Sequence, residues 1–190
     1  MATAIRSSPR LADPGTLLAT LHEAGGGLRV RLRLGRPSDA PRMRAFLESL
    51  SLETRQRRFG HAMPVIPDHV VRHFTFFNPR ERLVVVAMGI YDGREEIAGV
   101  ADVAGLGAGL AELGVVVDDD QQGLGVGKLL TEVIASLAIQ QGAARLKSDL
   151  LERNAPMLSL LERLGPTVST VEDGVSVAYT TLPAMRRRAA

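Results

Sequence analysis

The chain has 190 residues, of which 45% are hydrophobic and 23% charged, and its net charge is +2. These values are typical of one packed globular domain, and no apolar run approaches the roughly 20 residues needed to cross a membrane. The absence of cysteine excludes disulfides, cysteine-ligated zinc and a cysteine nucleophile. The start of the chain, with polar residues after Arg6, lacks the apolar segment of a secretory signal, so the expected compartment is the cytoplasm.

Three regions are expected along the chain. Residues 1–27 are predicted to form a flexible N-terminal arm. Two prolines and the triple glycine at 25–27 bracket one possible short helix around 16–24, and the glycines are expected to act as a flexible joint. Residues 28–183 are predicted to form one folded domain, and 184–190 a short basic tail. The domain opens with Leu28–Leu34, where apolar residues alternate with arginines, so this strand should have one exposed face.

The remaining elements follow from hydrophobic periodicity and turn residues. Apolar residues three and four apart predict helices, short β-branched runs predict strands, and two Asp-Gly pairs predict tight hairpins. The order of elements predicts an α/β (α+β) fold with a mixed, mostly antiparallel central sheet and helices on both faces. In chain order we expect helices at 37–50, 52–59 and from 67 onward, strands at 83–88, 96–103 and 110–117, a helix from 123 to 142, a strand at 145–150, a helix at 154–164 and a hairpin of 168–171 with 175–181.

The most informative stretch runs from Val117 to Lys128, where an apolar strand ends on three aspartates and a glycine-dense loop opens a helix. Bare backbone N–H groups at such a turn can bind phosphate. The stretch is not a P-loop, because Gln122 and Leu129 stand where that motif needs glycine and Ser or Thr. It is not a dinucleotide fingerprint, because Lys128 or Leu130 takes the place of the third small residue. A kinase loop fails in the same way, and no His-Arg-Asp segment follows.

The pattern that fits is Gln122-x-x-Gly125-x-Gly127 at the end of an apolar strand. It resembles the Arg/Gln-x-x-Gly-x-Gly/Ala loop of the GNAT superfamily of N-acetyltransferases, which holds the pyrophosphate of acetyl-CoA. The resemblance extends from roughly Leu28 to Tyr179 and includes Asn154-Ala155-Pro156-Met157. It implies a single GNAT-like domain with acetyl-CoA as the acyl donor. The alternative is a capped turn that binds no ligand.

The resemblance assigns cofactor binding to the end of this strand and to the loop. Val115, Val116 and Val117 would pair through their backbone with the pantetheine arm, and an amide near Val116 or Val117 would face the thioester oxygen. Lys128 would add a cation beside the phosphates. Asn154 matches the family's asparagine against the pantetheine, and it is also a good helix N-cap. The loop residues expected to bind the cofactor are Gln122, Gly123, Leu124, Gly125, Val126, Gly127 and Lys128.

Glu112 is the predicted catalytic base. An amine with a lysine-like pKa of about 10.4 must lose a proton before it attacks, and several bacterial protein lysine acetyltransferases carry a glutamate at the matching place. The alternative is a strand carboxylate paired with an arginine. Leu161 replaces the tyrosine with which the family often protonates the thiolate, so water or Ser159 would take that role. Without cysteine, direct attack in a ternary complex is favoured over an acyl-enzyme.

No metal site is predicted. His69 and His73 have the i, i+4 spacing of a helical metal pair, but no glutamate follows His69 and no third ligand is evident. The aspartates Asp118–Asp120 are predicted to form a solvated turn that faces away from the pyrophosphate. Four large apolar residues are predicted to lie in the core: Met63, Phe74, Phe76 and Phe77.

The arginine-rich segment Leu50–Phe59 resembles the Leu-Ser-x-x-Ser/Thr…Arg-Phe region of bacterial Pat-type protein lysine acetyltransferases. The resemblance implies a protein or peptide lysine as acceptor, and the arginines favour acidic residues near it. The alternatives are a small amine, such as an antibiotic or a polyamine, and a catalytically silent sensor module that binds acyl-CoA. Aromatic residues are scarce and not interleaved with the arginines, so a nucleic-acid partner is not expected. A membrane partner is not expected either, and a homodimer stays open.

Overall fold

A computed structural model of the chain describes residues 11–91, 93–151 and 154–184. In chain order its helices and strands are α1 (Pro14–Ala19), β1 (Leu21–Glu23), β2 (Arg29–Leu34), α2 (Ala40–Ser49), α3 (Leu52–Phe59), α4 (Asp68–Thr75), β3 (Arg82–Tyr91), β4 (Arg94–Gly107), β5 (Leu110–Val117), α5 (Val126–Gln140), β6 (Arg145–Leu150), α6 (Ala155–Leu164), β7 (Thr167–Glu172) and β8 (Val175–Thr181). Short 3-10 turns lie at Gly25–Gly27, Pro37–Asp39 and Asp119–Gln121.

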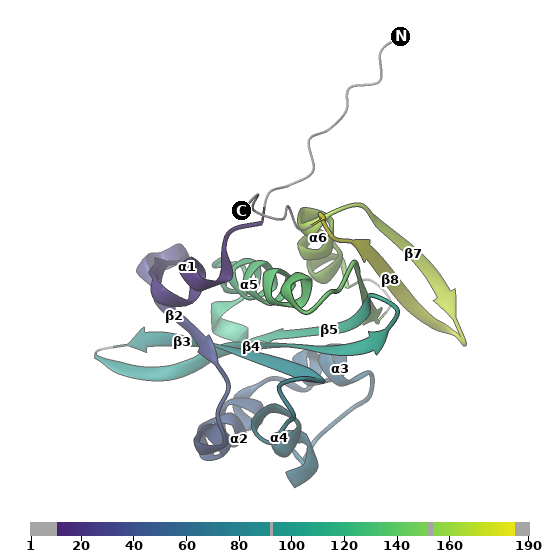
Figure 1. Ribbon diagram of the computed structural model, residues 1–190. Helices are drawn as coiled ribbons and strands as arrows, with labels where there is room; N and C mark the ends of the chain where they lie inside the picture. The colour runs from purple at the N-terminus through teal and green to yellow at the C-terminus, as the bar shows by residue number, and fades with distance from the viewer. Residues whose placement is uncertain (1–10, 92, 152–153, 185–190) are drawn as a thin grey trace.

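The described strands form one sheet in the order β1-β2-β3-β4-β5-β6-β8-β7. Within it, β5 and β6 are the one parallel pair that the described residues contain. The helices α1, α5 and α6 lie on one face of the sheet, and α2, α3 and α4 lie on the other (Figure 1). The predicted mixed, mostly antiparallel sheet with helices on both faces is therefore confirmed, and α3, β5 and β6 have the predicted bounds.

The N-terminal region belongs to the fold from residue 11 onward. β1 pairs with β2 in an antiparallel register, and Leu17 of α1 is only 8% exposed in the core. Asp13 caps α1 by accepting a hydrogen bond of 2.9 Å from Thr16 N. The prediction of an arm outside the fold is therefore wrong for residues 11–27, because the prolines and glycines shape short turns that pack on the sheet. Residues 1–10 and most of the predicted basic tail lie outside the described residues.

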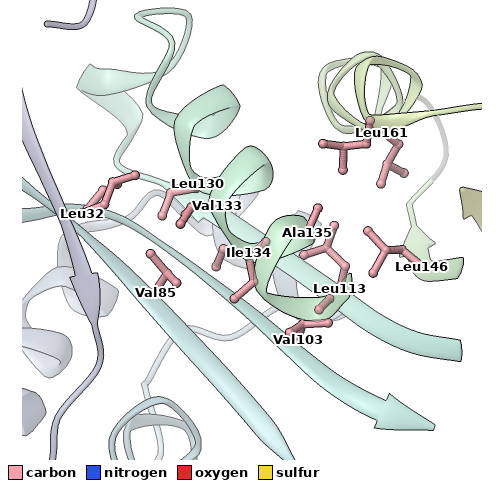
Figure 2. Packing of buried hydrophobic residues seen from close by; sticks show 14 of the residues in the cluster. Leu32, Val85, Val103, Leu113, Leu130, Val133, Ile134, Ala135, Leu146 and Leu161 are labelled. Atoms are coloured by element: carbon pink, nitrogen blue, oxygen red, sulfur yellow. The ribbon is translucent and has the colours of Figure 1, made fainter. Parts of the chain in front are cut away.

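Two hydrophobic layers enclose the sheet, as the alternation of strand side chains requires. On one face, Val85 and Val103 lie beneath Leu130 and Ile134 of α5 (Figure 2). On the other face, α2 and α4 bury Phe74 together with further strand residues. Of the residues predicted to be core, Met63 and Phe74 are buried and Phe77 packs partly against them, but Phe76 is 57% exposed. No helix in the described part of the chain has the length and apolar character of a membrane span.

Candidate active site

The parallel strands β5 and β6 pair over only part of their lengths. Their register joins Leu110–Glu112 to Arg145–Lys147, although both strands continue beyond these residues. Just past the last pair, Ser148 Oγ donates a hydrogen bond of 3.1 Å to Leu113 O. The strands then diverge, so the last part of β5 has an edge that no other described strand occupies.

This free edge of β5 offers the backbone of Val115 and Val117. Asp118 N donates a hydrogen bond of 2.9 Å to Ala98 O in β4. Because backbone groups of successive residues point to opposite neighbours, those of Val116 also point to β4, whereas those of Val115 and Val117 point into the split. The side chain of Val116 is buried in the core beneath α2 and α4. Of the three valines expected to pair with the pantetheine, Val116 therefore has no backbone group at the free edge.

The loop after β5 leaves several backbone N–H groups without acceptors. Gly123 and Gly125 have φ angles of 75° and 95°, a left-handed conformation that glycine adopts without strain. α5 then begins with no side-chain cap, and the first N–H groups of a helix have no intrahelical partner. Converging N–H groups at the positive end of a helix dipole can bind an anion such as a pyrophosphate. Between Gln121 and Leu129, the N–H groups that donate to no protein acceptor are those of Gly123, Gly125, Val126, Gly127 and Lys128.

Two other predicted loop residues make structural contacts. Leu124 N is 3.4 Å from Gln121 O, and Leu124 O accepts a hydrogen bond of 2.7 Å from Gly25 N. The Lys128 side chain is exposed, with its Nζ 3.8 Å from Glu132 Oε1. Lys128 therefore remains close to the unpaired amides, whereas the backbone of Leu124 is occupied in joining the loop to the N-terminal segment.

The carboxylate of Asp119 joins the loop to α3. Its carboxylate accepts hydrogen bonds of 2.8 Å from Ser51 N, 2.8 Å from Ser51 Oγ and 2.6 Å from Thr54 Oγ1. Gln122 Nε2 donates to Thr54 Oγ1 at 3.1 Å and to Val117 O at 3.3 Å. The prediction of a merely solvated aspartate turn is therefore wrong for Asp119. Although burial raises the pKa of Asp119, the bonds from Thr54 and Ser51 outweigh it and lower that pKa.

The last two positions taken from the resemblance lie on α6. Asn154 Oδ1 accepts a hydrogen bond of 3.2 Å from Met157 N, which confirms its predicted role as the N-cap of α6. Its contact with pantetheine stays a prediction. Leu161 is fully buried, so its side chain only packs in the core.

Glu112 lies on the sheet face that carries α2, α3 and α4, and its side chain is exposed. In the described residues it takes part in none of the recorded ion pairs, so pairing with an arginine is not supported. Residues in register lie about 5 Å apart and point to the same face. The register places five residues in one row across the sheet: Arg82, Ala104, Glu112, Lys147 and Tyr179.

Lys147, beside Glu112, is held by carboxylates on its other side. Its Nζ lies 3.8 Å from Asp149 Oδ1 and 3.6 Å from Glu172 Oε2. Desolvation opposes the charged form, but Asp149, Tyr179 and Glu172 together raise the pKa of Lys147. Tyr179 Oη donates to Glu172 Oε1 at 2.9 Å, and this bond raises the pKa of Tyr179. Lys147 is therefore a stable cation next to Glu112.

On the opposite side of Glu112, a buried carboxylate gathers three basic side chains. Asp102 Oδ1 accepts a hydrogen bond of 2.5 Å from Arg58 Nη2, while Oδ2 accepts from His73 Nε2 at 3.0 Å and from Arg82 Nη1. Burial raises the pKa of Asp102, but the charge of Arg58 and the bond from His73 hold that pKa below its ordinary value. Sequence reasoning missed this cluster. Its one local signal is an aspartate inside the apolar run 97–103.

The same contact explains His73, which had the spacing of a metal ligand with His69. Its Nε2 is committed to Asp102. Across the residues that the structure describes, no group of three or more His, Cys, Asp or Glu side chains could hold a metal ion.

A hollow of about 650 Å³ beside β2 and the start of α2 lies away from this site and is lined by Arg31, Arg33, Arg36 and Arg42. Asp39 engages Arg33 through two hydrogen bonds of 2.7 Å, and Glu95 lies 3.1 Å from Arg31. Arg31 and Arg33 in this hollow are therefore engaged in ion pairs within the protein. The split and the loop therefore locate the candidate active site better than the size of a cavity does.

Known proteins show the same arrangement of elements. Among solved structures, the GNAT domain of S. lividans PAT is 26% identical, with a TM-score of 0.75, over 86% of this chain and 96% of that chain. A cAMP-binding acyltransferase from Mycobacterium smegmatis is 21% identical, with a TM-score of 0.57, over 89% of this chain and 49% of that chain. A putative phosphinothricin N-acetyltransferase is 19% identical, with a TM-score of 0.61, over 81% and 99%. The last two likenesses show the fold alone.

The model of the acetyltransferase (GNAT) family matches residues 43–165. This range is more than half of the chain, and it includes the split strands, the loop with unpaired N–H groups and Glu112. The chain therefore belongs to the acetyltransferase (GNAT) family, whose members transfer an acetyl group from acetyl-CoA to an amine.

Proposed function

We propose that this protein acetylates the side-chain amine of a protein or peptide lysine, by direct attack within a ternary complex. The observation that carries the proposal lies at the end of β5, where the split from β6 meets the unpaired N–H groups of the loop. A strand edge can pair with an extended pantetheine arm, and the amides can bind a diphosphate. The described residues thus fit both the pantetheine arm and the diphosphate of acetyl-CoA.

The binding residues would divide into two groups. Val115 and the N–H of Val117 would pair with the pantetheine, since Val117 O already accepts a hydrogen bond from Gln122 Nε2. Asn154 lies at the N-terminal end of α6. Gly123 and the first turn of α5 would hold the pyrophosphate, and Lys128 would add a positive charge. Gln122 and Leu124 would keep the loop in shape, since their recorded contacts are with α3, β5 and the N-terminal segment.

The chemistry needs a base and a stabilised oxygen. Acetyl-CoA supplies an activated carbonyl carbon and a thiolate leaving group. Glu112 accepts a proton from the acceptor ammonium, and the neutral amine then attacks the carbonyl carbon. As the C–N bond forms and the C–S bond breaks, the nitrogen releases its second proton to water, which leaves the neutral amide. The N–H of Val115 or Val117 donates to the carbonyl oxygen as negative charge develops. The thiolate, with a pKa of about 8.5, takes a proton from water.

The choice of lysine rests on α3 and on the likeness to the GNAT domain of S. lividans PAT. Leu50–Phe59, which includes α3, has the Leu-Ser-x-x-Ser/Thr…Arg-Phe pattern of Pat-type enzymes, and α3 lies on the same sheet face as Glu112 (Figure 1). Its arginines favour an acceptor with acidic groups near the amine. They disfavour a polyamine, which would need an acidic pocket.

The second candidate is a catalytically silent module that binds acyl-CoA and acts as a sensor. The observation that favours it is Leu161, because the family's thiolate-protonating tyrosine is replaced there by a buried apolar side chain. Such a module would bind acetyl-CoA through the same loop and strand edge. It would acetylate no amine.

The test measures free thiol released from acetyl-CoA, with lysine peptides, polyamines and aminoglycosides as acceptors. We expect turnover with a lysine peptide, and we expect Glu112→Gln to lower kcat by about 10²- to 10⁴-fold, the usual contribution of general base catalysis. The amide is isosteric with the carboxylate, so the melting temperature should be retained. Tight acetyl-CoA binding without turnover of any amine would establish the silent module instead.

A further inference from the structure

We infer that Arg58 is the residue that selects the acceptor, because its guanidinium is built into the sheet beside Glu112 to bind an acidic group next to the reactive amine. The inference rests on the proposed transfer to an amine at Glu112. The proposed function attributes a preference for acidic acceptors to the arginines of α3 in general, whereas this inference assigns the contact with the acidic group to Arg58 alone.

Gly114 provides the space for this guanidinium. A Cβ on Gly114 would lie 2.5 Å from Arg58 Cζ and 2.9 Å from Arg58 Nη1, so any side chain there would force the guanidinium to move. Gly114 does not have a positive φ, so the strand conformation itself does not require glycine. Arg58 therefore lies directly on β5, two residues beyond Glu112. Two residues of a strand span about 7 Å.

The guanidinium is held in place on several sides. Asp102, in register with Gly114, binds Arg58 Nη2, and the rings of Phe59 and Phe74 lie 5.4 Å and 5.5 Å from Arg58 Cζ. A planar cation fixed by a carboxylate and by aromatic rings loses little further freedom when it binds a ligand. The site is therefore preorganised.

Donors remain available on this fixed group. Arg58 Nη1 makes no hydrogen bond to the described residues, and the side chain keeps 16% of its surface exposed, whereas Nε is buried and out of reach of a ligand. Asp102 neutralises one positive charge, yet Arg58 and Arg82 both bind it. The pair of arginines therefore keeps a net positive charge, on the side of Glu112 opposite the carboxylates Asp149 and Glu172.

These features point to a carboxylate on the acceptor, near the amine that Glu112 deprotonates. A charge-assisted hydrogen bond to such a group contributes about 10- to 100-fold in binding. A protein lysine with a neighbouring Asp or Glu carries this chemistry, and so does a small amine that bears its own carboxylate. The experiment therefore includes both kinds of acceptor.

The measurement is the ratio of kcat/KM for two peptides that differ only in Glu or Gln beside a single lysine. We expect the wild type to prefer the Glu peptide by about 10-fold or more, and Arg58→Gln to bring the ratio close to 1. Arg57→Gln is the matched control, since this neighbouring arginine of α3 is more exposed and pairs with Glu53; it should keep the wild-type ratio. Free amino acids and their carboxamides form the second pair of acceptors.

Two further variants separate recognition from folding. Gly114→Ala keeps Arg58 and Asp102 but displaces the guanidinium, and Arg58→Gln with Asp102→Asn removes the charge and its buried partner together. Both should lose the charge preference in protein that still melts cooperatively. A wild-type ratio near 1, or a preference that persists in all these variants, would overturn the assignment of Arg58. Absence of turnover with any amine would instead overturn the proposed function.

Discussion

At the scale of single residues, the charge of Asp102 controls how stability depends on pH. Its carboxylate is 4% exposed and binds Arg58, His73 and Arg82. Because these contacts hold its folded-state pKa below the unfolded value of about 3.9, the stability it contributes is fully present above that unfolded pKa. It is lost as the pH falls through the folded pKa.

Asp102→Asn should therefore destabilise the protein by about 3–5 kcal/mol at pH 7, since it removes a buried carboxylate and leaves the partly buried Arg58 and Arg82 without a counter-charge. Urea unfolding at several pH values measures the difference from the wild type. That difference should narrow as the pH falls below about 4. The control is Asp149→Asn on the same face, where 55% of the side chain is exposed and little change is expected. A difference independent of pH would contradict this account of Asp102.

At the scale of elements, α3 bridges the two halves of the site. Its N-terminus is bound to the loop through Asp119 and Gln122, and its C-terminal turn carries Arg58 above Gly114. The Leu-Ser-x-x-Ser/Thr pattern thus has a local physical explanation here. Ser51 caps α3 through Thr54 N, and both hydroxyls bind Asp119.

Asp119→Asn should destabilise the fold by about 1–2 kcal/mol, because it removes a negative charge from the N-terminus of α3 and weakens three hydrogen bonds. It should also weaken acetyl-CoA binding in calorimetry, since Gln122 and the loop share the same contact with Thr54. Asp120→Asn is the control: this neighbour is exposed, and its side chain makes none of the recorded hydrogen bonds. Equal effects of the two changes would show that only the charge of the turn matters.

At the scale of the whole molecule, ligand binding and folding should be coupled. A ligand that binds only the folded state at about 100 times its Kd stabilises by about 2.7 kcal/mol, which corresponds to a rise in Tm of about 5–10 °C for a chain of this size. Saturating acetyl-CoA should produce this rise. Gly125→Ala should reduce it, since Gly125 has a φ of 95° and alanine is strained there by about 1–2 kcal/mol. An unchanged rise in the variant would place the ligand elsewhere.

The sequence by itself determined the elements that depend on neighbours along the chain. The bounds of α3, β5 and β6, the glycine loop and the N-cap Asn154 follow from periodicity, turn chemistry and capping, which act within a few residues. Glu112 is singled out through the resemblance to bacterial lysine acetyltransferases and its place on the cofactor strand near the loop, and its role as the base stays a prediction.

Only the tertiary structure decided which distant residues meet. The direction of the Val116 backbone depends on the pairing of β5 with β4, and the cluster around Asp102 joins α3, α4, β3 and β4. Asp119 bonds to Ser51 across 68 residues of chain, and residues 11–27 pack because β2 offers an edge. The physical reason is that buried side chains and hydrogen-bonding groups find their partners in other elements of the fold. No local sequence pattern specifies which distant residue that partner will be.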